Sequence, residues 1–130
     1  MKIIKNKEDL LKQDECSAEL SLDIYETDDE LIVQSPIAGV KKQDLDVYVD
    51  KGMLVINGQR SEKTEESKKN YIYQECYWGK FSRRVILPAE IDETKIEASL
   101  KDGLLTIKFP KSKKSEQTED KIQIDNIKEE

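Results

Sequence analysis

Apolar and polar residues alternate along two similar stretches of this chain, and each stretch predicts a β-hairpin. In residues 96–109 apolar side chains stand at every second position on both sides of Asp102-Gly103, the dipeptide that most readily forms a tight turn. Residues 45–56 repeat the pattern around Asp50-Lys51-Gly52. Two such hairpins are too few for a solenoid, so we expect each to belong to one sheet of a β-sandwich.

Further strands are predicted on both sides of the first of these hairpins. Residues 20–26 alternate, and after an acidic turn residues 31–33 form an apolar run, so together they predict another hairpin. Asn57-Gly58 provides a possible bend or bulge in the following strand. Residues 81–87 predict a strand that ends at Pro88. The expected fold class is all-β, with the sandwich domain spanning residues 20–110.

Polar segments flank and interrupt this domain. Residues 1–19 contain no aromatic side chain, and a short helix starting near Asn6 would be marginal alone, so we expect an arm that becomes ordered only against a partner. Residues 61–70 hold no hydrophobic side chain and predict a loop or disordered insert. Residues 111–130 form a C-terminal extension whose first half has the composition of a solvated linker.

The aromatic residues are concentrated immediately after the polar insert. Tyr71, Ile72 and Tyr73 begin a stretch that also contains the single tryptophan. A long polar loop leading into an aromatic strand is typical of an edge element that reaches across to another subunit. The alternative is that Trp78 and Phe81 fill the core of their own domain, and we expect this of at least one of them.

Arg83 stands in phase with the apolar positions of its predicted strand. An arginine on such a face is rarely buried without a partner, so a carboxylate from another strand or another subunit should meet it. The alternative is a half-exposed strand edge along which the aliphatic part of the side chain packs.

Composition excludes several classes of function. The chain has 130 residues, of which 38% are charged, and its net charge is -6. Lysines alternate with acidic residues and form no basic patch, which argues against a nucleic-acid partner. The sequence contains no apolar segment long enough for a signal peptide or a membrane span, so we expect a cytoplasmic protein.

Candidate catalytic and metal-binding residues are scarce. The sequence has no histidine, which removes the most frequent general base and metal ligand. Cys16 and Cys76 are far apart and outside any C-x-x-C pattern, so we interpret them as free thiols. We find no glycine-rich phosphate loop and no nucleophile–base pair, and we predict neither an enzyme nor a cofactor or metal site.

The C-terminal extension carries two isoleucines separated by one residue. Ile122 and Ile124 would point the same way on an extended chain. A polar linker separates them from the sandwich, so we expect them to lie outside its core. Their spacing favours a plug that fills a groove.

Several motifs together make the chain resemble a small heat shock protein of the bacterial type, built on an alpha-crystallin domain. That family has an A-x-x-x-x-G-x-L signature, which is matched here by Ala98, Gly103 and Leu105 with Leu100 between them. It also has an I-x-I/V motif in its extension, matched by Ile122-Gln123-Ile124. Similar to the bacterial branch are the stretches D-I-Y-E-T-D-D-E-L, P-I-A-G-V and F-S-R-R-V-I-L-P.

The resemblance implies an immunoglobulin-like β-sandwich that dimerises by exchanging a strand at about Tyr71–Cys76. It places Tyr71, Ile72, Tyr73 and Arg83 at the dimer interface. The two isoleucines of the extension would dock between edge strands of a neighbouring dimer, which gives a homo-oligomer built from dimers. Such proteins hold partly unfolded clients without ATP. The arm differs from the family pattern because it is short and lacks aromatic residues.

Two alternatives come from other classes of protein. A CS-domain co-chaperone has a similar sandwich and acts as a monomer on a dedicated partner, but Ile122-Gln123-Ile124 argues against it. An enzyme would need a convergent polar site, and the sequence does not reveal one.

Overall fold

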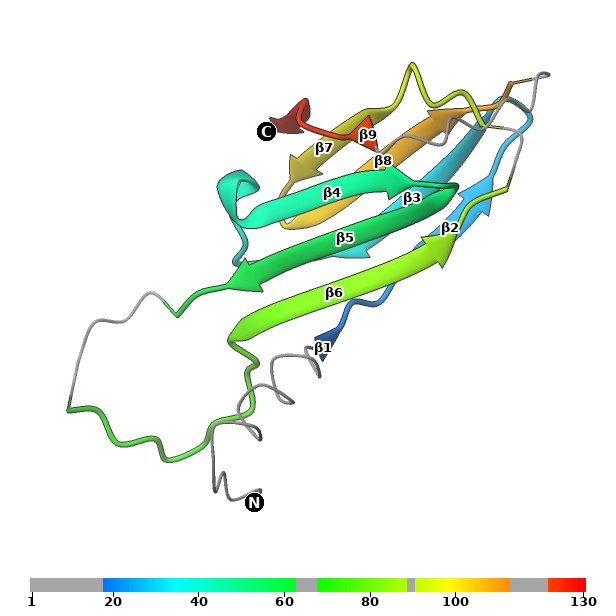
Figure 1. Ribbon diagram of the computed structural model, residues 1–130. Helices are drawn as coiled ribbons and strands as arrows, with labels where there is room; N and C mark the ends of the chain where they lie inside the picture. The colour runs from blue at the N-terminus through cyan, green and yellow to red at the C-terminus, as the bar shows by residue number, and fades with distance from the viewer. Residues whose placement is uncertain (1–17, 63–67, 89–90, 113–121) are drawn as a thin grey trace.

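Two five-stranded sheets pack face to face in the computed structural model, which describes residues 18–62, 68–88, 91–112 and 122–130 (Figure 1). One sheet has the strand order β1-β6-β5-β4-β9, and the other has the order β10-β7-β8-β3-β2. A short 3-10 helix, Lys42–Asp44, precedes β4. The strands are β1 Ala18–Glu19, β2 Asp23–Glu26, β3 Glu30–Pro36, β4 Leu45–Asp50, β5 Met53–Arg60, β6 Gly79–Ile86, β7 Glu97–Lys101, β8 Leu104–Pro110, β9 Ile122–Gln123 and β10 Ile127–Glu129.

The two similar stretches of sequence form two hairpins, one in each sheet. Strands β4 and β5 are antiparallel, and so are β7 and β8. Their turns have matching conformations, because Lys51 and Gly52 have φ values of 51° and 77° while Asp102 and Gly103 have 52° and 77°. Positive φ at both central residues is the turn that suits the twist of paired strands. The predicted sandwich with one such hairpin in each sheet is confirmed, and β2 and β3 form the third predicted hairpin.

The core lies between the two sheets and follows the alternation of the sequence. Val47, Val49 and Ile56 are at most 1% exposed on one sheet, and Ile107 and Phe109 are fully buried on the other. Ser35 is the one buried polar residue within the described part of the chain. Its hydroxyl donates a hydrogen bond to the carbonyl of Ser21 at 2.8 Å, which satisfies a group that would otherwise be costly to bury.

Strand β5 is continuous through Asn57-Gly58, so the predicted bend or bulge is wrong. Gly58 pairs with Leu45 on one side and with Phe81 on the other, in an uninterrupted register. A β-carbon at Gly58 would lie 2.4 Å from Cζ of Phe81. Glycine therefore serves here to let an aromatic ring approach the backbone, which is the other common reason for glycine inside a strand.

The sandwich begins two residues earlier in the chain than we expected. Ala18 and Glu19, which we expected in the arm, form a short strand parallel to β6. The rest of the arm, with the short helix expected near Asn6, lies outside the described residues, as do residues 63–67 of the polar insert.

The aromatic residues after the insert divide between core and surface. Phe81 is 4% exposed and belongs to the core, whereas Trp78 is 39% exposed. The expectation that at least one of them fills the core of its own domain is confirmed by Phe81. Within this single chain, residues 71–76 form no strand. No helix in the described part of the chain is long and apolar enough to cross a membrane.

Candidate functional site

The C-terminal segment, residues 122–130, lies against one edge of each sheet, formed by β4 and by β7 (Figure 1). Its first strand, β9, runs antiparallel to β4, with Ile122 opposite Val49 and Gln123 opposite Tyr48. The backbone N–H of Ile124 donates to the carbonyl of Val47 at 2.9 Å. The segment therefore supplies β4 with backbone partners along its outer edge.

Side chains of the same segment contact the sandwich by apolar packing and by polar contacts. Ile124 is 4% exposed, and Ile122 packs partly buried against the same hydrophobic core cluster. The Gln123 amide nitrogen donates to Oδ1 of Asp46 at 2.6 Å and to the carbonyl of Val47 at 3.1 Å. The expectation that both isoleucines lie outside the core is thus wrong for Ile124, because the extension folds back onto its own domain.

A second strand of the extension was missed in the sequence. Strand β10 runs parallel to β7, with Ile127 opposite Ala98, and the Ile127 side chain is 3% exposed. A three-residue strand is too short to show a period, and the I-x-I/V motif ends at Ile124. The only signal was a third isoleucine three positions later.

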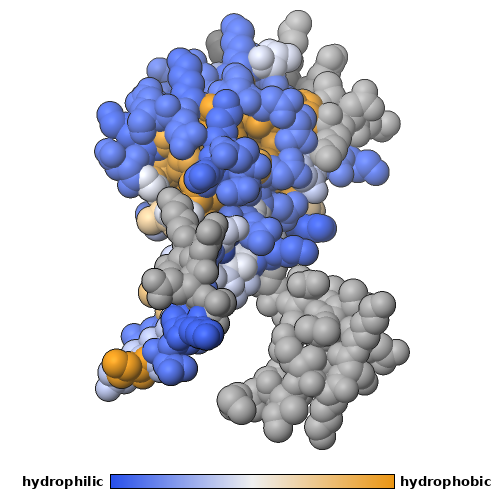
Figure 2. Space-filling view, turned by 90° about the vertical axis from the view of Figure 1, so that its left-hand side faces the viewer, coloured by the Kyte–Doolittle hydropathy of each residue, from blue (hydrophilic) through white to orange (hydrophobic). Residues whose placement is uncertain are grey.

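The aromatic residues 71–78 lie on the loop that joins β5 to β6 and projects from the sandwich, which we call the aromatic loop (Figure 1). Ile72 is 92% exposed and Tyr73 is 84% exposed, while Tyr71 is 46% exposed. Figure 2 shows a hydrophobic band between hydrophilic side chains across the upper body and a further hydrophobic spot at the tip of the projection at the lower left. Apolar side chains so fully exposed to water are typical of surfaces that bind another protein.

Strand β2 offers a second exposed surface. It pairs with β3, and within the described residues its outer edge carries no further strand. Ile24 is 42% exposed and Tyr25 is 45% exposed on this strand. An open strand edge with apolar side chains is a template for pairing with an extended segment of another chain.

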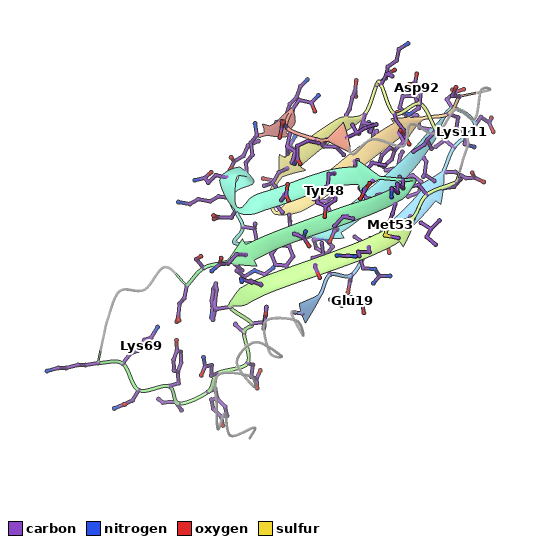
Figure 3. All side chains as sticks on the ribbon, viewed as in Figure 1. Glu19, Tyr48, Met53, Lys69, Asp92 and Lys111 are labelled. Carbon is purple, nitrogen blue, oxygen red and sulfur yellow. The ribbon has the colours of Figure 1, made fainter. Side chains whose placement is uncertain are left out.

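Polar contacts join the two sides of the aromatic loop. The Glu62 carboxylate accepts hydrogen bonds from the Lys69 ammonium and the Tyr71 hydroxyl (Lys69 is labelled in Figure 3). The Lys69 contact lowers the pKa of Glu62 most, and the Tyr71 contact lowers it further. The pKa of Lys69 is raised by the same contact with Glu62. Because the pKa of Glu62 is lowered, the stabilisation from these bonds is fully present when the pH is above the ordinary pKa of a glutamate. It is lost as the pH falls through the lowered pKa of Glu62.

Arg83 meets the carboxylate that its position predicted. Its Nη1 lies 3.3 Å from Oε1 of Glu19 and donates to the carbonyl of Leu20 at 3.2 Å (Glu19 is labelled in Figure 3). The partner comes from another strand of the same chain, β1. The ion pair is partly exposed, so its net contribution to stability is small, and its place at a dimer interface stays a prediction.

The A-x-x-x-x-G-x-L signature is structural. Ala98, Leu100 and Leu105 are each at most 5% exposed. Gly103 has a φ of 77°, and a β-carbon there would lie 3.1 Å from Cα of Ala38. The Gly103 carbonyl accepts the backbone N–H of Ile37 at 2.6 Å, which ties the β7–β8 turn to the end of β3.

Cysteines and acidic residues form no reactive cluster in the part of the chain that the structure describes. Cys76 is an exposed free thiol, as expected, and Cys16 lies outside the described residues. No group of three histidine, cysteine, aspartate or glutamate side chains that could hold a metal ion occurs among those residues. The candidate site is therefore a set of binding surfaces: the edges of β4 and β7 that residues 122–130 cover, the aromatic loop and the open edge of β2.

Comparisons with known proteins agree on one family. A family model described as Hsp20/alpha crystallin family matches residues 23–125. Small heat shock protein C4 of Rickettsia felis is 37% identical over 100 residues, which is 77% of this chain and 61% of that protein. Heat shock protein 16 of Schizosaccharomyces pombe is 41% identical over 106 residues, covering 80% of this chain and 73% of that one. The chain spans about three fifths of the length of the Rickettsia relative.

Solved structures show the same fold. Heat shock protein 16.0 from Schizosaccharomyces pombe superposes with a TM-score of 0.68 at 36% identity, covering 83% of this chain and 99% of that chain. A small heat-shock protein from Xylella fastidiosa gives a TM-score of 0.66 at 29% identity, covering 76% of this chain and 91% of that chain.

Proposed function

The chain belongs to the Hsp20/alpha-crystallin family, and we propose that it is an ATP-independent holdase that binds partly unfolded proteins and suppresses their aggregation. A denatured client exposes apolar surface and unpaired strand edges, and binding of these features slows aggregation by mass action on the unfolded state. No covalent chemistry is required. The observation that carries the proposal is the family match over residues 23–125.

Exposed apolar residues support client binding. The aromatic loop presents Ile72 and Tyr73 almost entirely to solvent, and β2 presents Ile24 and Tyr25 beside an open edge. These surfaces could receive an apolar segment of a client or an identical segment of a second copy of the chain. The charged remainder of the surface, with 22 basic and 28 acidic residues in the whole chain, would keep a loaded complex in solution.

Dimerisation by strand exchange is the first step of the assembly that we propose. Residues 71–76 of one protomer would pair with the open edge of β2 in its partner, because backbone pairing would bury exposed apolar side chains of both elements. Arg83 would lie at the same interface. The exposure of Tyr71, Ile72 and Tyr73 in the single chain supports this step.

Exchange of the C-terminal extension is the second step. In the single chain the segment pairs with its own β4, with Ile124 in the core cluster and Ile122 packed against it, and we propose that the same contacts form between neighbouring dimers. Burial of each isoleucine contributes about 1.5–3 kcal/mol, and ordering of the tail offsets part of that gain. One docked tail would therefore exchange readily, whereas several tails would stabilise an oligomer together. The relative from Xylella fastidiosa has a high-order structure.

Light scattering of a heated client tests the proposed function. The wild-type chain should reduce scattering in proportion to its concentration, to the same extent with and without ATP. The control is an unrelated acidic protein at equal mass concentration, which should have little effect. Absence of protection of every client tested, at any molar ratio and with or without ATP, would contradict the holdase proposal.

A further inference from the structure

We propose that Arg60 is a positioning residue, which fixes the direction in which the aromatic loop leaves the sandwich and so prepares the loop for pairing with a second copy of the chain. Arg60 is the last residue of β5, and Gly79, the first residue of β6, lies opposite it. The aromatic loop begins and ends at this pair (Figure 1). Only the consequence for dimerisation rests on the strand exchange proposed above.

The Arg60 side chain is anchored to a fixed part of the sandwich. Its Nε donates a hydrogen bond to the carbonyl of Ala38 at 2.7 Å. Ala38 follows Ile37, which is fully buried and whose backbone N–H donates to the carbonyl of Gly103 at 2.6 Å. A hydrogen bond from a charged donor is stronger than one between neutral groups. The guanidinium is therefore held against a segment that the β7–β8 turn keeps in place.

The same guanidinium contacts the returning side of the loop. Nη1 of Arg60 donates to the carbonyl of Tyr77 at 3.5 Å, which is a long and weak hydrogen bond. The guanidinium carbon also lies 5.9 Å from the centroid of the Phe81 ring, within reach of a cation–π interaction. Arginine presents its donors in a rigid plane, so it can contact two carbonyls and a ring at once. A lysine ammonium cannot reproduce this arrangement.

Tyr77 and Gly79 give the backbone a defined turn at the entry to β6. The Tyr77 hydroxyl donates to the carbonyl of Lys80. Gly79 has a φ of 140°, a conformation that other residues rarely adopt. A β-carbon at Gly79 would lie 3.2 Å from the Tyr77 hydroxyl oxygen. The returning side of the loop is therefore shaped by its own residues and tied to the sandwich by Arg60.

A fixed loop base lowers the cost of pairing with another chain. The contacts of the Glu62 carboxylate with Lys69 and Tyr71 also join the two sides of the loop, and past them Ile72 and Tyr73 are almost entirely exposed. A segment that is already aimed loses less conformational entropy when it binds. Loss of the Arg60 contacts should therefore weaken dimerisation and leave the sandwich folded.

Fluorescence of Trp78, the single tryptophan of the chain, tests the loop contact directly. Trp78 is 39% exposed and stands between Tyr77 and Gly79. In Arg60→Lys, which keeps the charge, acrylamide quenching of the full chain should rise toward the value of the urea-unfolded chain. The matched control is Arg84→Lys, because Arg84 is an exposed arginine on β6, and its quenching should equal that of the wild type.

A second variant changes the other side of the contact. Tyr77→Phe removes the hydroxyl that bonds to the Lys80 carbonyl and keeps the ring, and it should also raise the quenching of Trp78. If Arg60→Lys and Tyr77→Phe both match Arg84→Lys, the positioning role is refuted. If hydrogen exchange shows that β3 and β8 lose protection in Arg60→Lys, Arg60 is a general structural residue, which also overturns the proposal.

The consequence for assembly is measured separately. Native mass spectrometry over a dilution series counts monomers and dimers apart from larger species. The dimer dissociation constant of Arg60→Lys should rise about tenfold, which corresponds to about 1.4 kcal/mol, the scale of one hydrogen bond to a charged group. The control Arg84→Lys should keep the constant of the wild type.

The loop contact and the strand exchange can fail independently. Raised quenching with an unchanged dissociation constant would refute the role of Arg60 in dimerisation. A wild type that is monomeric at every concentration would refute the strand exchange itself, and the quenching of Trp78 would still decide whether Arg60 fixes the loop.

Discussion

Gly58 offers a sharp test of how the core positions β5 and β6. A β-carbon at this position would lie 2.4 Å from Cζ and 2.8 Å from Cε2 of Phe81, and 3.1 Å from the carbonyl oxygen of Asp44. The backbone of Gly58 lies outside the positive-φ region, so alanine fits its conformation and the clash alone sets the cost. Phe81 is 4% exposed, and its ring can move only by displacing other core atoms.

The expected cost of Gly58→Ala is about 2 kcal/mol, within the range for a methyl group forced into a packed core. With a urea m-value of about 2 kcal/mol/M for a domain of this size, the unfolding midpoint should fall by about 1 M. The assay is urea unfolding followed by far-UV circular dichroism at one fixed protein concentration, because assembly makes the apparent stability depend on concentration.

A double-mutant cycle identifies the cause. Phe81→Leu removes the ring atoms nearest to Gly58 and should cost about 1 kcal/mol alone, on the usual scale of large-to-small core changes. The double variant should be more stable than the sum of the single effects by at least about 1 kcal/mol, because the new methyl group fills the space that the ring left. Single effects that add to within about 0.5 kcal/mol would refute the steric reasoning.

Three further predictions concern the turn, the loop and the tail. Gly103→Val should destabilise the domain by about 1–3 kcal/mol because it puts a β-branched residue at a φ of 77°. An unchanged melting temperature would show that the turn does not need glycine at this position. Deletion of residues 61–70 should leave monomers or aggregates that keep the strands of the sandwich, whereas a native-like dimer in size-exclusion chromatography would count against strand exchange. The double variant Ile122→Ala/Ile124→Ala should shift light scattering from larger oligomers toward dimers, with Ile86→Ala as the matched control. An oligomer of unchanged size would remove the exchanged-tail proposal.

The sequence predicted best where the signal is local. The β4–β5 and β7–β8 hairpins each combine a period of two with a turn that needs positive φ, and both requirements can be read within a short window. The position of Arg83 among apolar residues predicted either a carboxylate partner or a half-exposed strand edge, and the structure has both, because Glu19 pairs with a side chain that is 34% exposed. The identity of that partner depended on how β1 folds back along β6, which no local pattern records.

The sequence misled where tertiary contacts override a local signal. Asn57-Gly58 has the composition of a turn, but strands on both sides hold β5 straight, and the glycine accommodates the ring of Phe81. The polar linker suggested that Ile124 lies away from the core, but a chain of that length also allows a return to the same domain. Strand β10 is too short for a periodic signal, so Ile127 could be found only from its burial.

The native mass of the wild-type chain distinguishes the proposed assembly from a monomer, because strand exchange and tail exchange both require more than one copy. Native mass spectrometry at physiological ionic strength should give even multiples of the chain mass of 15.1 kDa, with species larger than the dimer. A chain that is monomeric across the concentration range, with Ile72 and Tyr73 still exposed, would contradict the proposed assembly and the mechanism built on it.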